Sequence, residues 1–100
     1  MMPTTKSETP FEQLVSLHLR LLALQANANS EVSAGEDAAS SGDSFKAEQH
    51  FRTSELYRHQ IEDVSADIQK RFDSAPELRL LNERIKSEAQ KRYGAYGPSP

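Results

Sequence analysis

The sequence predicts an all-α protein, an elongated helical hairpin with a third helix added. Apolar residues recur every three or four positions, and no segment shows the strict alternation of a β-strand. Residues that start and end helices divide this pattern into three helical segments, at about 10–41, 43–72 and 76–93. A chain of 100 residues holds one domain. We place that domain at 9–93 and expect disorder in the tails at 1–8 and 94–100.

The first helix begins in the sequence "TPFE". Thr9 is suited to the N-cap, where its side chain accepts from the backbone N–H of Glu12 while Glu12 reaches back to Thr9. Pro10 occupies the first helical position, where its missing N–H is not needed. These residues predict a capping box at the start of the helix.

The first helix carries more apolar residues than one stripe holds: Phe11, Leu14, Val15, Leu17, Leu19, Leu21, Leu22 and Leu24. A helix that is apolar around most of its circumference must be covered on several sides. The cover comes either from both other helices or from another copy of the protein. We expect a second copy or a partner to contact this helix, at Leu14, Leu17, Leu21 and Leu24.

The end of the first helix and the turn after it contain helix-breaking residues. Asn27, Asn29 and Ser30 weaken helix propensity, so the helix either breaks near 27–30 or runs on to Ser41. Gly42 suits the left-handed position just past a helix end, and Asp43 suits the N-cap of the next helix. "SSGD" therefore predicts a tight turn between antiparallel helices.

The second helix has a heptad-like seam, formed by Ala47, His50, Ser54, Tyr57, Ile61, Val64 and Ile68. His50 within this seam either fixes the register of packing or titrates as a switch. The sequence "DSAPE" ends the helix, because Pro76 disfavours helical backbone at the residue before it. Ser74 and Glu77 predict a capping box for the third helix, with an apolar face of Leu78, Leu81 and Ile85.

Two resemblances cover the turn region. The spacing of Gly35, Gly42, Ala47, Phe51 and Ser54 resembles one tetratricopeptide-type helical hairpin, in which small residues let two helices approach and an aromatic ring fills the space beyond them. The match covers residues 35–54 as a single copy. It implies close packing of the hairpin, and it does not imply a peptide-binding groove.

The second resemblance, at about residues 36–60, is to an uncharacterised alphaproteobacterial family of unknown function. The matching residues are Asp37, Ala38, Ser40, Ser41, Gly42, Asp43, Ala47, Glu48, Glu55 and Tyr57. The family carries a basic arm suggestive of RNA binding, which this sequence lacks. The resemblance therefore implies no activity for this chain.

The chain lacks the residue patterns of known catalytic chemistry. It has no cysteine, which excludes disulfides, thiolate metal sites and cysteine nucleophiles. It has no Gly-x-Ser-x-Gly motif and no glycine-rich phosphate loop. Glu55, His59 and Glu62 share one helix face, either as metal ligands or as a solvated face. We expect the solvated face, no metal, no cofactor and no enzymatic activity.

Charge is divided unevenly along the chain. Residues 1–69 carry five Lys and Arg against eleven Asp and Glu, whereas residues 70–100 carry seven against four. The basic segment could contact nucleic-acid phosphates, through Arg84, Lys86, Lys91 and Arg92. It could equally complement the acidic half of the same or another protomer.

These observations predict a small non-enzymatic interaction protein: an adaptor, regulator or inhibitor that binds a protein partner and self-associates as a homo-oligomer. The alternative is an accessory nucleic-acid-binding protein that uses the basic C-terminal segment. The apolar run of 14–24 is interrupted by polar residues and is too short to span a bilayer. We therefore expect a cytoplasmic protein with no membrane contact.

Overall fold

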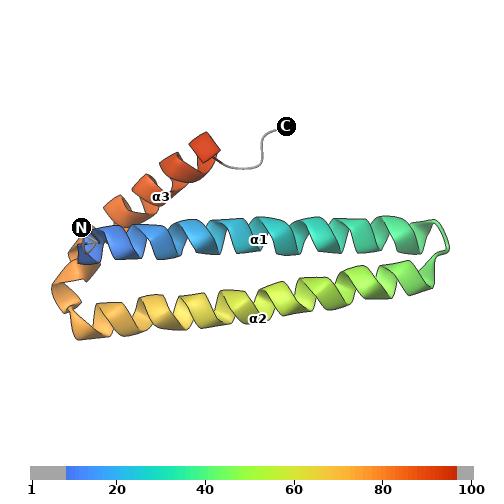
Figure 1. Cartoon of the computed structure of the whole chain (residues 1–100), viewed down its shortest axis with the longest axis horizontal. Coiled ribbons are helices and arrows are strands. Elements are labelled where there is room, and N and C mark those ends of the chain that lie inside the picture. Colours follow the sequence, from blue (N-terminus) through green and yellow to red (C-terminus); the bar gives the residue numbers. More distant parts are fainter. Residues whose placement is uncertain (1–8, 97–100) are drawn as a thin grey trace, which may run out of the picture.

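The computed structural model describes residues 9–96, and these residues form an elongated all-α arrangement. The elements are α1 (Pro10–Ser40), α2 (Ser44–Ser74), the short 3₁₀ helix η1 (Pro76–Leu81) and α3 (Asn82–Tyr96). Helices α1 and α2 pack side by side as an antiparallel hairpin, and α3 starts beside the N-terminal end of α1 and packs against α1 at an angle (Figure 1). The predicted fold class is confirmed, and residues 9–96 contain no strand.

Helix α1 is continuous over 31 residues, so the question of a break at 27–30 is settled. Asn27, Asn29 and Ser30 are exposed, while Ala28 between them is buried. The polar side chains face solvent and cost only helix propensity, because the face that packs stays apolar. Thr9 caps the helix by accepting from the N–H of Glu12 at 3.1 Å, as predicted.

The turn between α1 and α2 has the predicted geometry. Gly42 has φ +85°, in the left-handed region, and Asp43 accepts from the Lys46 N–H at 3.0 Å. The N–H groups of Gly42 and Asp43 donate to the carbonyls of Ala39 and Ala38, at 3.0 Å and 2.9 Å. These bonds satisfy carbonyl groups that the helix end would otherwise leave without partners.

Helix α1 is the central helix, because α2 and α3 each pack against it. One stripe of α1 at helical spacing belongs to the hairpin and includes Leu14, Leu17, Leu21, Leu24, Ala28 and Gly35. A second stripe lies under α3 and comprises Phe11, Val15, His18 and Leu22. Two covers on adjacent sides account for the wide apolar circumference.

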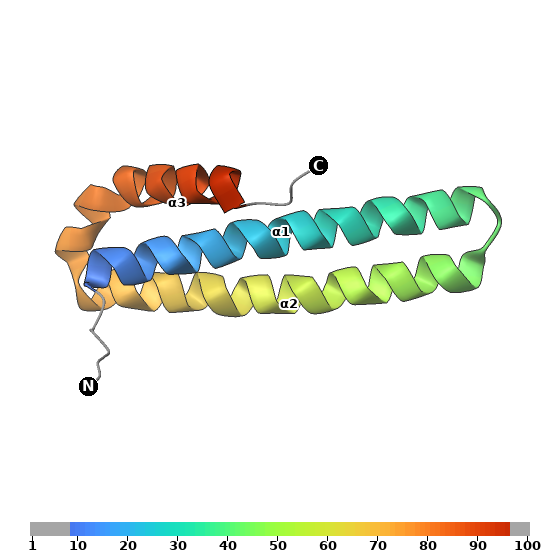
Figure 2. The same cartoon turned by 45° about the horizontal axis from the view of Figure 1, so that its top comes forward.

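The second stripe of α1 becomes polar where its cover ends. At the same helical spacing its later positions are exposed polar residues: Asn29, Ser33, Glu36 and Ser40. Figure 2 shows that α3 extends over only the N-terminal part of α1 and leaves the part near the turn uncovered. The length of apolar stripe therefore matches the length of the helix that covers it.

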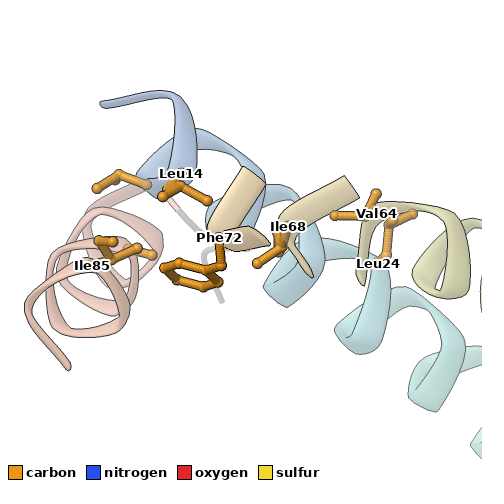
Figure 3. Packing of buried hydrophobic residues seen from close by; sticks show 8 residues of the cluster. Leu14, Leu24, Val64, Ile68, Phe72 and Ile85 are labelled. Atoms are coloured by element: carbon orange, nitrogen blue, oxygen red, sulfur yellow. The ribbon is translucent and has the colours of Figure 1, made fainter. Parts of the chain in front are cut away.

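The largest buried side chains gather where α3 meets the hairpin. Leu14, Val15 and Ile85 are fully buried, and Phe72 and Ile68 pack with them (Figure 3). Towards the turn the buried residues are small: Ala28, Gly35, Ala38, Ala47 and Ser54. The predicted seam of α2 is confirmed, since each of its seven residues is buried or half-buried.

The third helical segment differs from its prediction at both ends. Ser74 remains in α2, and η1 starts after Ala75 with no side-chain cap, so the capping box predicted at Ser74 and Glu77 is wrong. Proline restricts the residue directly before it, which moves the boundary to Ala75. At the far end α3 includes residues 94–96, which were expected to be disordered. Residues 1–8 and 97–100 lie outside the described range.

Gly35 and Phe51 form the closest contact within the hairpin. A Cβ added to Gly35 would lie 2.6 Å from the Phe51 ring, closer than packed carbon atoms approach. The ring thus occupies the space that any larger residue at 35 would need. Phe51 is 40% exposed, because it lies at the edge of the hairpin rather than between the two helices.

The turn yields a prediction at Gly42. Replacing Gly42 by Ala should destabilise the fold by about 1 kcal/mol, because a side chain there adopts left-handed backbone at a cost. No atom lies within 4 Å of the added Cβ, so the loss comes from the backbone alone. Chemical denaturation measures it.

Gly94→Ala is the matched control. A Cβ at Gly94 also meets nothing within 4 Å, but this residue lies inside α3 and has no positive φ. The control should leave stability unchanged or raise it slightly, because alanine favours helix. Equal losses in both variants would contradict the left-handed assignment of Gly42.

A second prediction concerns the Gly35–Phe51 contact. Gly35→Ala gains up to about 1 kcal/mol of helix propensity but incurs an overpacking cost of roughly 1–3 kcal/mol. In the wild type we therefore expect a neutral to destabilising change. In a Phe51→Ala background the ring is gone, so the same change should be stabilising. Denaturation of the wild type, the two single variants and the double variant gives the coupling energy between the two residues. If the two stability changes simply add, the contact is refuted.

Candidate interaction surface

The leucines predicted to face a partner need a correction. Leu14 and Leu24 are buried in the protein's own core, and Leu17 and Leu21 are partly buried and pack against it. Their apolar stripe is the one that α2 covers. The prediction left open how many sides of α1 the rest of the chain covers. Both α2 and α3 cover it, so these leucines are not free for a partner.

The basic residues of the last segment have partners within the chain. Arg92 donates to Glu12 of α1 at 3.1 Å and to Glu88 of α3 at 3.0 Å. These hydrogen bonds, that to Glu12 first, raise the pKa of Arg92 above its ordinary value. Lys91 lies 3.8 Å from Glu88. The hydrogen bond between Arg92 and Glu12 thus ties α3 to the start of α1.

Arg84 and Lys86 are exposed on α3. The Arg84 guanidinium lies 5.9 Å from the centre of the Phe11 ring, close enough for a cation–π contact. Lys86 lies beside a cavity that His18 also lines. Two of the four predicted basic residues thus have partners within the chain, since Arg92 is bound to carboxylates and Arg84 rests on an aromatic ring.

Polar contacts between the helices include one pair of a histidine and a glutamate. His50 Nδ1 lies 2.8 Å from Glu31 Oε1 across the α1–α2 interface, which joins the two helices in the half of the hairpin nearer the turn. His59 lies 3.7 Å from Glu62 on an exposed face of α2. Within residues 9–96, no three or more His, Asp and Glu side chains gather closely enough to bind a metal ion.

His18 is a polar residue within the second stripe of α1. Its Nε2 atom is buried and has no hydrogen-bond partner among the described residues. Burial, and secondly the charge of Lys86, lowers the pKa of His18 below its ordinary value of 6.5. The neutral ring is therefore the form that the packed structure favours.

The large apolar side chains that remain exposed lie elsewhere. Phe45 is 71% exposed and Leu56 62% exposed on α2, and Leu80 of η1 is 88% exposed. Phe45 and Leu56 are eleven residues apart, close to three full turns, so they share one face. That face points away from the seam that packs on α1. We call the face from Phe45 to Leu56 the outer face of α2.

Sequence reasoning missed the outer face, although a signal was present. The heptad-like seam of α2 explains seven of its residues, and Phe45 and Leu56 lie off that seam. Two large apolar residues that the predicted core does not use, on one face, were the available indication. Either residue alone would indicate nothing, since single exposed apolar side chains are common.

Comparison with family models, curated proteins and solved structures finds no match for this chain. A search of the helices between residues 9 and 96 finds none with the length and apolar character to cross a bilayer.

His18 predicts how stability depends on pH. Below its ordinary pKa of 6.5 the unfolded chain binds a proton at His18 that the folded chain still excludes. Stability should therefore fall as pH decreases through this window, and above it His18 contributes no dependence. Denaturation at about pH 7.5 and about pH 5.5 measures the loss.

Two variants isolate the contribution of His18 from that of the carboxylates. His18→Leu and His18→Gln, one apolar and one polar, both remove the titrating group. Each should reduce the stability difference between the two pH values, whatever its effect on stability at high pH. An unchanged difference in both variants would rule out His18 as a source of the pH dependence.

Proposed function

We propose that this protein is a non-enzymatic helical interaction protein that self-associates through the outer face of α2. The observation that carries the proposal is the exposure of Phe45 and Leu56 on one face, at 71% and 62%. The core does not use either side chain, so their burial is left to a contact with another surface. The occupant we propose is a second copy of this chain.

The outer face is self-complementary, which favours a second copy over an unrelated partner. Phe45 and Leu56 lie about equally far from the midpoint between His50 and Phe51. In a two-fold pair of antiparallel α2 helices centred there, Phe45 of each copy lies across from Leu56 of the other. Isologous contacts of this kind are the commonest form of homodimer.

Charges on the same face support this register. Glu48 and Arg52 are joined at 2.9 Å within one copy and are both largely exposed. Their own midpoint is His50, half a residue from the midpoint of Phe45 and Leu56, so in this register Arg52 of one copy lies about one residue along the axis from Glu48 of the other. Exposed ion pairs add little stability, but they set register and orientation.

The energetics indicate a weak and reversible dimer. The contact buries four large side chains, two from each copy, each contributing roughly 1.5–3 kcal/mol when fully buried. Association itself costs on the order of 4–15 kcal/mol. The balance favours assembly that depends on protein concentration. Such a protein would offer different surfaces to its partners as a monomer and as a dimer.

The prediction is tested by sedimentation across a concentration series. The wild type should move from monomer to dimer, while Phe45→Glu combined with Leu56→Glu should stay monomeric. Both residues are exposed, so helicity and the thermal midpoint should remain close to wild type. Leu80→Glu, also at an exposed leucine but on η1, is the control and should still dimerise.

A charge exchange tests the register. Arg52→Glu alone places like charges together across the proposed contact and should weaken the dimer. Adding Glu48→Arg restores opposite charges within and between copies and should recover it. A wild type that is monomeric at every concentration contradicts self-association. Retention of a different protein that the Phe45 and Leu56 variant loses would assign the outer face to that partner instead.

A further inference from the structure

A cavity of about 300 Å³ opens where all four elements meet, at the end of the hairpin opposite to the turn. Its walls include His18 of α1, Ile68 and Phe72 of α2, Arg79 of η1, and Asn82 and Lys86 of α3. This volume is at the lower end of the range for small-molecule sites. The cavity is remote from the outer face of α2, so binding within it is independent of self-association.

The cavity combines an apolar wall with positive charge. Ile68 and Phe72 belong to the core, and each exposes only 7% of its surface at the cavity wall. The Arg79 guanidinium lies 5.6 Å from the centre of the Phe72 ring and donates to Asp73 at 2.8 Å. Gln69 also donates to Asp73, at 3.1 Å. These contacts hold Arg79 in place, with its charge largely balanced by Asp73.

Lys86 supplies the charge that is not balanced. Among residues 9–96 no carboxylate lies within ion-pair distance of its ammonium group, whereas Arg79 has Asp73. An ammonium group on a flexible stem at the rim of an apolar cavity attracts an anion. The Asn82 amide adds hydrogen-bonding capacity on the same wall.

His18 is the residue that α1 contributes to the cavity wall. Its Nε2 is buried without a hydrogen-bond partner among the described residues, and buried polar atoms nearly always have one.

We propose that this cavity binds a small organic carboxylate, with its apolar body against Ile68 and Phe72 and its carboxylate beside Lys86 and Asn82. The apolar wall distinguishes such a ligand from inorganic phosphate, which offers no surface to bury. The unbalanced charge of Lys86 distinguishes it from a neutral molecule of the same shape.

Benzoate, benzamide and inorganic phosphate are the probes, and backbone amide NMR shifts of the full chain are the measurement. Benzoate should produce saturable shifts at the residues that line the cavity. Benzamide and phosphate should produce none that saturate in the same range, because benzamide lacks the charge and phosphate lacks the apolar body. These comparisons use the wild type and do not depend on any variant folding.

Lys86→Met keeps the aliphatic stem and removes the charge. It should weaken benzoate binding by about fivefold or more, the ratio that corresponds to ~1 kcal/mol. Lys91→Met, on the same helix but outside the cavity walls, is the matched control and should bind as the wild type does. Both lysines are exposed, so both variants should fold.

Four results would overturn the site: no saturable shifts with benzoate, shifts centred elsewhere, equal binding of benzamide or phosphate, or full binding by Lys86→Met.

Discussion

The structure depends on the need to cover α1 on two sides. Its hairpin stripe and its second stripe together extend around much more of the helix than one neighbour can bury. Helix α2 covers the first and α3 the second, and Phe72 of α2 and Ile85 of α3 meet in the core where the two covers adjoin. The short helix η1 serves this arrangement by turning the chain back over α1. The apolar residues of the second stripe stop at Leu22, within the part that α3 covers.

Features set by neighbouring residues could be predicted from sequence, and features set by tertiary contacts could not. The caps at Thr9 and Asp43 and the left-handed Gly42 follow from local backbone chemistry. The seam of α2 follows from periodicity. The break near 27–30 stayed open because propensity alone is weak, and packing at Ala28 decided in favour of a continuous helix. Glu12 was assigned to the cap, but Arg92 engages it across 80 residues of sequence.

The candidate sites were harder to predict than the fold, for two different reasons. The outer face of α2 consists of residues that the core leaves unused, so it becomes visible only once the core is known. The cavity draws residues from all four elements, from His18 to Lys86, and no local spacing links them. Leu14 and Leu24 illustrate the converse case. Their pattern was read correctly as a contact face, but the contact is within the chain.

The position of α1 between its two covers also orders events while the chain is being made. The hairpin stripe can find its partner once α2 has left the ribosome, because synthesis proceeds from the N-terminus. The second stripe finds its partner only when residues 82–96, which follow α2 in the sequence, have emerged. Until then Phe11, Val15 and Leu22 face solvent on an otherwise formed hairpin. Premature termination after α2 would leave this surface permanently open, so a chain truncated there would expose an apolar stripe that α3 otherwise covers.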